Sequence, residues 1–381
     1  MRRYFVLIVM ALVLTFSNAV HAQFGGITVP PSGDNQHSIA TQYIGPVEIT
    51  IDYNSPNVHA PDGSDRRGKI WGTLVPWGMG KEAFGTCGDK CPWRGGANEN
   101  TVFKTTHDIK IQGEKLPAGS YGMHFLPGEQ EWTVIFSKNY TAWGSFFYNP
   151  KEDALRVKAK PEKSEYHEWL TYDFIDRETD HGTVALKWED LQVPLKIEVE
   201  NIEDLYIAKI EEELKNSAGF TWQNFASAAQ YTLQTKKHTD KGLDWAKKAV
   251  NFAFVGQENF TTLMTLGQLQ EANGQTAEAK TSFEKALSHP SAGPIDIHQY
   301  ARNLQAAKKT EEAIKIFELN AKKFPNQWPT EVGLTRALSA KGNYKEALKH
   351  AKLALAQAPN DQNRTNLENM IKTLEQGKDI N

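Results

Sequence analysis

The residues with the clearest chemical potential lie between Phe84 and Thr101, in the stretch FGTCGDKCPWRGGANENT. Cys87 and Cys91 are the only cysteines of the chain, and a structural disulfide, a metal site or a redox centre could each use such a pair. Gly88 between them lets the backbone turn back, which favours a disulfide, provided that the two Cα atoms come within about 6 Å. A zinc site normally takes four ligands, and no second cysteine cluster exists. We therefore predict a disulfide and no metal ion, with metal and redox sites as the alternatives.

The segment after the cysteines is a candidate ligand site. Arg94 offers a planar, five-donor guanidinium that suits a carboxylate or a phosphate. The next two residues are glycines, which allow a ligand to approach the backbone closely. Asn98 and Glu99 add an amide and a carboxylate, so these side chains could line a pocket for an anion or a sugar. In the alternative interpretation, Arg94 satisfies carbonyls at the end of a strand or pairs with an internal acid.

Histidines supply the remaining candidate chemistry of the first half of the chain, but no HxH or HxxxH pair occurs among His59, His107, His124, His167 and His181. His124 would lie on the opposite face of its strand from Tyr121 and Phe125. The chain also lacks a GxSxG nucleophile motif, an HExxH motif and a glycine-rich phosphate loop. We therefore assign no catalytic residue and expect no cofactor, although a pocket with Arg94, Glu99 and His124 would suit a hydrolase-like enzyme.

Short runs of alternating apolar residues between residues 47 and 199 predict a β-domain. The clearest run places Leu191, Val193, Leu195, Ile197 and Val199 on one face, since side chains alternate along a strand. About nine such runs, including 69–75, occur without helical patterns between them, which indicates an antiparallel sandwich or barrel. The aromatic residues expected in its core are Tyr121, Phe125, Trp132, Phe136, Trp169 and Phe174.

The second half of the chain contains a helical repeat. Ala279, Ala313 and Ala347 recur at a spacing of 34 residues, and each repeat ends in a proline, at Pro290, Pro325 or Pro359. This period resembles the tetratricopeptide repeat, whose stacked helix pairs form a solenoid with a concave groove. The repeats are therefore predicted to bind a protein or peptide, or else to serve as a spacer for the β-domain.

The N-terminal residues predict export. Two arginines precede an apolar run from Tyr4 to Phe16, and a small-residue cleavage pattern ends at Ala22. Without Arg2 and Arg3 the mature chain has 41 basic and 46 acidic residues, a net charge of −5, which argues against nucleic acid as a partner. No later apolar run is long enough for a transmembrane helix, which needs roughly 20 residues. We expect a periplasmic or secreted protein that is cleaved near Ala22.

These patterns give four predicted segments: a signal peptide at 1–22, an all-β domain at 38–200, a connecting helix at 201–219 and helical repeats at 220–376. The blocks RRGKIWGTLVPWG, PWRGGANENT, LPAGSYGMHFLPGEQEWTVIFSK and LRVKAKP resemble the exported bacterial family called domain of unknown function 2911. The resemblance implies an all-β fold, often followed by tetratricopeptide-like helices, and no established activity. Between LVPWG and WRGGAN that family normally has only a few residues, whereas this chain has the insertion MGKEAFGTCGDKCP, which carries both cysteines. A disulfide there would therefore reinforce a local loop.

Two functions of different class follow from the sequence. In the first, which we favour, the protein is an exported, non-catalytic binding or scaffold protein. Its β-domain recognises a small ligand or envelope component, and its repeats recognise a protein or peptide. In the second, it is a periplasmic enzyme, which requires Arg94, Glu99 and His124 to converge in one pocket.

Overall fold

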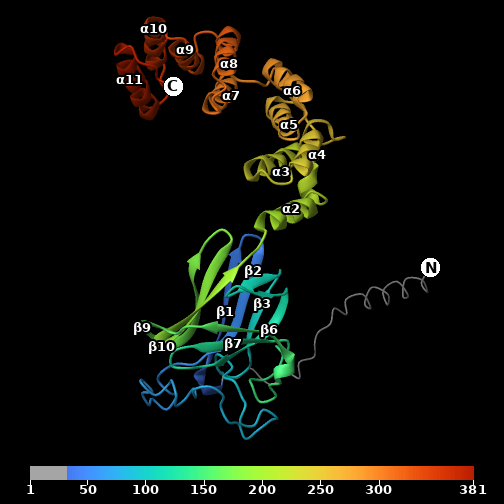
Figure 1. The fold of residues 1–381 in the computed structure, drawn as a ribbon, viewed down its shortest axis with the longest axis vertical. Helices are drawn as coiled ribbons and strands as arrows, with labels where there is room; N and C mark the ends of the chain where they lie inside the picture. The colour runs from blue at the N-terminus through green and yellow to red at the C-terminus, as the bar shows by residue number, and fades with distance from the viewer. Residues whose placement is uncertain (1–31) are drawn as a thin grey trace, which may run out of the picture. The chain divides into compact units, whose positions relative to one another are not determined.

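The structure of the protein is a computed structural model that describes residues 32–381. The predicted signal peptide, residues 1–22, lies outside the described residues. Two compact units meet in the sequence between Ile202 and Glu203, and we call them the β-unit and the helical unit. Figure 1 shows the β-unit, built from β1–β10, and the helices α2–α11 that follow it.

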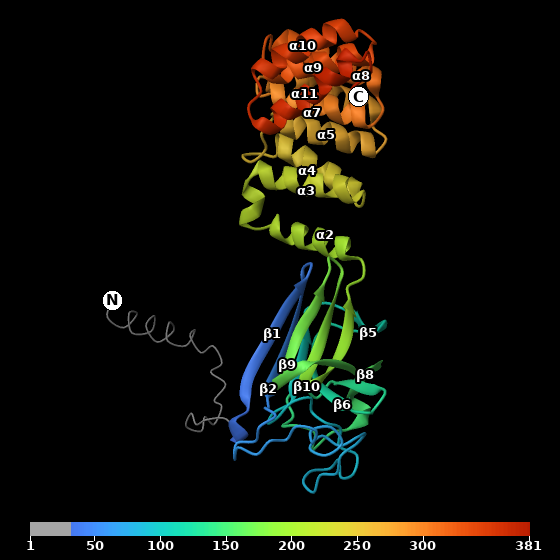
Figure 2. The same ribbon diagram turned by 90° about the vertical axis from the view of Figure 1, so that its left-hand side faces the viewer.

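The β-unit contains two antiparallel sheets, neither of which closes on itself. The six-stranded sheet has the order β1-β2-β3-β6-β7-β8 and the four-stranded sheet the order β5-β4-β10-β9. The strands of the first sheet are β1 (Gln36–Ile44), β2 (Val47–Ser55), β3 (Thr101–Thr105), β6 (Gly119–Leu126), β7 (Trp132–Ser137) and β8 (Asp153–Ala159). Those of the second are β5 (Glu114–Leu116), β4 (Ile109–Ile111), β10 (His181–Glu198) and β9 (Glu162–Arg177). Figure 2 shows β9 and β10 as a long antiparallel ribbon.

The two sheets face each other across a buried aromatic core. The rings of Tyr53 on β2 and Tyr172 on β9 meet edge to face with centroids 4.9 Å apart, and the Ser55 hydroxyl donates to the Leu170 carbonyl at 2.6 Å. Two facing antiparallel sheets with a shared core are a sandwich, so the predicted fold class is confirmed in its sandwich form and not as a barrel.

Most of the predicted core residues are buried, with one exception. Tyr121, Phe125, Trp132, Phe136 and Phe174 are all at most 6% exposed. Trp169, however, is 38% exposed, so its assignment to the core was wrong. The reason is the strand period: Leu170, Tyr172 and Phe174 point inward, and Trp169 therefore faces the other side of β9.

The connection between β2 and β3, residues 56–100, contains no strand, although the run 69–75 was predicted to be one. Trp71 and Val75 form only an isolated bridge. Gly72 between them has a φ of 79°, a left-handed conformation that turns the chain and ends any extended run. Conversely, β1 was not predicted, because its mixed sequence QHSIATQYI lacks a clear apolar alternation.

The helical unit is a stack of helix pairs (Figure 2). Its helices are α2 (Ile202–Glu213), α3 (Trp222–Thr235), α4 (Thr239–Asn251), α5 (Phe260–Ala272), α6 (Thr276–Ser288), α7 (Pro294–Ala306), α8 (Thr310–Lys323), α9 (Trp328–Ala340), α10 (Tyr344–Ala356) and α11 (Asp361–Glu375). The connecting helix was predicted to reach Gly219, whereas α2 ends at Glu213 and a 3-10 helix covers Ser217–Phe220. No helix in the described part of the chain is long and apolar enough to cross a membrane.

The 34-residue spacing corresponds to buried positions in the stack. Ala279, Ala313 and Ala347 are at most 2% exposed and lie on α6, α8 and α10. Each of these helices ends two or three residues before the proline that closes its repeat. Small residues at these positions let neighbouring helices approach closely, which explains the spacing.

Candidate functional site

The β-unit has a pocket of about 460 Å³ whose walls come from four separate segments, the first of which contributes Gly33 and Asn35. The 56–100 connection contributes Trp93, Arg94 and Asn98, the loop after β7 contributes Trp143 and Phe146, and β10 contributes Trp188. Of the four predicted ligand-binding residues, Arg94 and Asn98 therefore line one pocket. Four aromatic residues beside a set of polar and charged side chains are typical of a small-molecule site.

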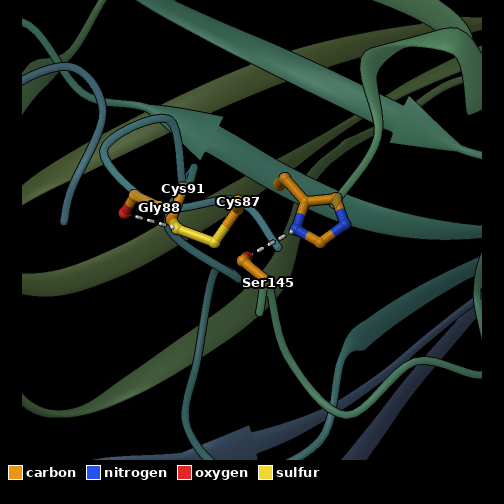
Figure 3. The surroundings of a disulfide bond; sticks show 5 residues. Cys87, Gly88, Cys91 and Ser145 are labelled. Carbon is orange, nitrogen blue, oxygen red and sulfur yellow. Dashed lines mark hydrogen bonds between the residues drawn. A yellow bond between two sulfur atoms is a disulfide. The ribbon is translucent and has the colours of Figure 1, made fainter. Parts of the chain in front are cut away.

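The structure joins Cys87 and Cys91 in a disulfide, with Cα atoms 5.1 Å apart. The turn between them passes through Gly88 at a φ of 60°, and the Cys91 Sγ lies 3.4 Å from the Gly88 carbonyl oxygen (Figure 3). Both cysteines are buried and pack against Ile135 and Tyr148. The disulfide is thus part of a small core that the 56–100 connection shares with β7 and the loop that follows it.

The stapled loop also holds one wall of the pocket in place. The backbone N–H groups of Thr86 and Cys87 both donate to the Phe146 carbonyl, at 2.8 and 3.1 Å. Gly85 passes so close that a Cβ there would lie 2.2 Å from the same oxygen. The disulfide-bonded loop therefore fixes the backbone that carries Phe146. The positions of the two cysteines in the sequence did not predict this contact.

Arg94 is the cation of the pocket. Its Nη1 donates to the Asn98 carbonyl at 2.5 Å, and its Cζ lies 5.3 Å and 5.1 Å from the ring centroids of Trp143 and Phe146. Within residues 32–381, no carboxylate comes within 4.0 Å of the guanidinium. Burial lowers the pKa of Arg94, opposed by the more distant charges of Glu82 and Glu99. A partly buried cation without an ion-pair partner favours an anionic ligand.

Asn98 and Glu99 have different positions relative to the pocket. Asn98 lines it, adopts a left-handed φ of 57° and accepts a hydrogen bond from the Asn35 side chain at 3.3 Å. Glu99 is not among the lining residues, and its carboxylate accepts a hydrogen bond from the Asn54 amide at 2.9 Å. Since side chains of successive residues diverge, Glu99 helps to hold the turn and does not line the pocket.

His124 is buried and is not one of the pocket's lining residues. It is 2% exposed, and its Nδ1 lies 3.0 Å from the Ser145 Oγ, the contact drawn beside the disulfide in Figure 3. Burial, together with the nearby charge of Arg94, lowers its pKa to about 4, so the ring is neutral at neutral pH. The enzyme hypothesis requires Arg94, Glu99 and His124 to converge in one pocket. Of these three residues, only Arg94 lines it.

Sequence reasoning missed Trp188 as a pocket residue. Trp188 is 1% exposed, and its rings lie within a cluster with Trp71, Trp93 and Trp132 at centroid distances from 5.1 to 6.3 Å. The indole Nε1 of Trp188 is buried and has no hydrogen-bond partner among the described residues. Trp188 ends a run of the β type, and nothing in its sequence position indicated a ligand-binding role. The aromatic run at 140–148, which lies between strands, was the available signal for Trp143 and Phe146.

A second polar cluster lies where the 56–100 connection crosses β9. The Glu168 carboxylate accepts hydrogen bonds from the backbone N–H of His59 at 2.8 Å and from the Tyr166 hydroxyl at 2.5 Å. Burial alone would raise the pKa of Glu168, but these bonds and the His59 ring hold it at about 2. In the described part of the chain, no group of three or more His, Cys, Asp or Glu side chains could hold a metal ion.

The helical unit has a groove of about 680 Å³ formed by α5, α6, α7 and α8. Phe283, Tyr300 and Ile316 give it apolar walls, and a salt bridge of 2.8 Å between Lys309 and Glu271 spans part of its rim. The Phe283 and Tyr300 rings lie 5.6 Å apart, centroid to centroid. The groove therefore combines apolar surface with charged groups of both signs.

Two arginines of the helical unit lie near each other, Arg302 on α7 and Arg336 on α9. Burial and the charge of Arg302 lower the pKa of Arg336 to about 10, opposed by the charge of Asp379, and the Nε of Arg336 is buried without a partner among the described residues. Among residues 32–381, neither guanidinium has a carboxylate within 4.0 Å. The Asn381 side chain contacts Arg336 at 3.4 Å and Gln305 on α7 at 2.5 Å, so residues near 381 lie beside this pair.

Comparison with known proteins agrees with this division of the chain. Residues 35–197 match the family described as "Protein of unknown function (DUF2911)", and residues 260–288 match the family described as "Tetratricopeptide repeat". No curated protein matches the chain.

Several solved structures resemble part of the chain. The crystal structure of MamA is 16% identical, covers 40% of this chain and 85% of its own, and has a TM-score of 0.28. YrrB, described as a TPR protein with an unusual peptide-binding site, is 16% identical over 45% of this chain and 84% of its own, with a TM-score of 0.27. A thermophilic TPR protein of Thermus thermophilus is 17% identical over 44% of this chain and 90% of its own, with a TM-score of 0.30. The two family matches show that the chain carries a DUF2911 region at residues 35–197, followed by tetratricopeptide-type repeats.

Proposed function

We propose that the protein is an exported, non-catalytic scaffold whose helical unit binds acidic segments of a protein or peptide partner. The observation that carries this proposal is the pair Arg302 and Arg336, two neighbouring guanidinium groups without a carboxylate partner in the described chain. Like charges that lie close together repel, and a carboxylate placed between them would remove the repulsion and pair both cations. Tetratricopeptide repeats commonly bind proteins, which agrees with this role.

The β-unit is proposed to hold a small ligand or an envelope component. The pocket around Arg94 supports this part of the proposal, because it combines aromatic walls with a cation that lacks an ion-pair partner among residues 32–381. The hydrolase alternative has less support, since Glu99 and His124 do not line the pocket.

Export is supported by the pattern of residues 1–22 and by the disulfide, since disulfides persist in oxidising compartments. Expression of the full chain in a Gram-negative host, followed by mass measurement of the periplasmic product, tests this part. We expect cleavage after Ala22. An uncleaved chain in the cytoplasm would contradict export and leave the binding sites unaffected.

Partner binding is tested by selecting peptides from a random library on the purified mature protein. We expect the enriched peptides to contain Asp and Glu, because these side chains pair with Arg302 and Arg336. The charge reversal Arg302→Glu should abolish this enrichment, whereas Arg302→Lys should retain most of it. Lys315→Glu, on an exposed position of α8, is the matched control and should change nothing. Equal enrichment by the native protein and Arg302→Glu would contradict the proposal.

A further inference from the structure

We propose that the Arg94 pocket binds a sugar acid, with its carboxylate on Arg94, its ring against the aromatic walls and its hydroxyl groups on Glu82 and the Trp188 indole. This inference rests on the proposed ligand-binding role of the β-unit and adds the chemical class of the ligand. Four observations support it: the charge of the pocket, its walls, its size and an unpaired buried donor.

The charge of the pocket favours one carboxylate. Its charged lining residues are Arg66, Arg94 and Glu82. Arg66 already donates from Nε to the Val58 carbonyl at 3.1 Å and from Nη2 to the Asn57 carbonyl at 2.7 Å. Arg94 uses one of its N–H groups for the Asn98 carbonyl and has others to offer. A carboxylate can accept two parallel hydrogen bonds from such a planar group, which an ammonium group cannot provide.

The walls and the size of the pocket favour a ring. Trp93, Trp143 and Phe146 line it, and Trp143 is 51% exposed. The Trp143 and Phe146 rings stack nearly parallel, with centroids 5.7 Å apart and an interplanar angle of 6°. A volume of about 460 Å³ lies within the roughly 300–1,000 Å³ of small-molecule sites and has room for one or two sugar rings.

Two polar groups of the pocket call for hydroxyl groups on the ligand. Trp188 is one of the lining residues, and its Nε1–H is buried and has no acceptor among residues 32–381. A buried donor without an acceptor is unfavourable by about 1–3 kcal/mol, and a ligand oxygen would remove that cost. The Glu82 carboxylate accepts hydrogen bonds but cannot donate them, so it suits a ligand that carries hydroxyl hydrogens. An acid without hydroxyl groups satisfies only the Arg94 part of the site.

The test uses the whole mature protein labelled with ¹⁵N and follows the indole N–H signals of its tryptophans by NMR. Sodium glucuronate, glucose, sodium benzoate and inorganic phosphate are titrated separately, each up to the same excess over the protein. We expect glucuronate to move the Trp188 signal and to bind at least about 10-fold more tightly than glucose or benzoate. Binding of phosphate at least as tight as that of glucuronate would overturn the carboxylate assignment.

Three variants separate ligand binding from structural effects. Arg94→Lys should weaken glucuronate binding at least about 10-fold, because a lysine cannot make the bidentate contact. Trp188→Phe should weaken it as well, because phenylalanine keeps an aromatic ring, though a smaller one, and removes the donor. The matched control is Trp132→Phe, since Trp132 belongs to the same cluster and has an unpaired Nε1 but does not line the pocket. It should leave binding unchanged, and an equal loss in Trp132→Phe and Trp188→Phe would overturn the proposal.

The outcomes also separate this inference from the proposed function. If glucose moves the pocket signals as strongly as glucuronate, the β-unit binds ligands but the acid class is wrong. If none of the four probes moves them, the sugar-acid inference is overturned. A wider set of small fragments that also leaves these signals unchanged would then remove the ligand-binding role of the β-unit itself.

Discussion

Arg94 shows what single residues contribute to the candidate site and how far the sequence could identify them. An arginine between a cysteine pair and two glycines was a sound candidate, and it lines the pocket together with Asn98. Glu99 and His124 were equally suitable by residue type, but their side chains lie outside the pocket. The aromatic walls could not be predicted, because Trp143, Phe146 and Trp188 join Arg94 from distant parts of the sequence.

At the same scale, the disulfide should contribute measurably to stability. The double variant Cys87→Ser and Cys91→Ser removes a cross-link over a short loop, and the loop-entropy relation gives a loss of about 2 kcal/mol in the free energy of unfolding. Equilibrium urea unfolding of the native and variant proteins measures this difference. Because the stapled loop holds the backbone of Phe146, the variant should also bind glucuronate more weakly. A variant with native stability and native binding would show that the disulfide has no role in ordering the pocket.

At the scale of elements, the edge strand β9 is covered by the beginning of the 56–100 connection. The Val58 N–H donates to the Glu168 carbonyl at 2.8 Å, and the Leu170 N–H donates to the Pro56 carbonyl at 2.9 Å. The Glu168 side chain then binds the backbone of His59. An unpaired strand edge invites association, so this covering both protects the sheet and anchors one end of the connection that forms the pocket.

This anchor predicts a specific dependence of stability on pH. The folded pKa of Glu168 is about 2, below its ordinary value of 4.5, so its contribution to stability is complete above pH 4.5 and is lost as the pH falls toward 2. Glu168→Gln should therefore flatten the decline of stability over this pH range, as measured by urea unfolding at several pH values. Glu165→Gln, at an exposed position of the same strand, is the control and should keep the native profile. An unchanged slope in Glu168→Gln would refute the anchor.

The helix pairs depend on close packing at glycine. A Cβ on Gly267 of α5 would lie 2.5 Å from the Phe283 ring on α6, so Gly267→Ala forces these two helices apart. We expect a loss of about 1–3 kcal/mol in the free energy of unfolding, as for other overpacked cores. Lys280→Ala, on the exposed surface of α6, should change it by less than about 0.5 kcal/mol. Thermal unfolding compares them, and a Gly267→Ala protein as stable as the native one would contradict the packing.

At the scale of the whole molecule, the sequence predicted a β-domain and a helical repeat but not which strands pair in the β-unit. The 34-residue period identified the repeats because each helix contacts its neighbours in the sequence. The order β1-β2-β3-β6-β7-β8 and β5-β4-β10-β9 could not be predicted, since strands far apart in the sequence pair with each other. The 56–100 connection was the hardest part to predict from the sequence. Its short apolar runs look like strands, but their side chains pack in the tryptophan cluster.

Each unit has its own core and its own arginine site, so the two binding activities should be separable. Arg94→Lys should weaken binding of glucuronate and leave the selected acidic peptide unaffected, and Arg302→Glu should do the reverse. Variants without shared partners usually have independent effects. Titrations of both ligands into both variants measure this, and a loss of both activities in either variant would contradict separate sites.

The central claim is that Arg302 and Arg336 bind the carboxylates of a partner. Calorimetric titration of a selected acidic peptide into the mature protein tests it most directly, with the native protein, Arg302→Lys and Arg302→Glu measured in the same buffer. We predict that Arg302→Lys binds within about 3-fold of the native affinity and that Arg302→Glu binds at least about 10-fold more weakly, because it places a like charge against the peptide. Native affinity in Arg302→Glu would contradict the claim.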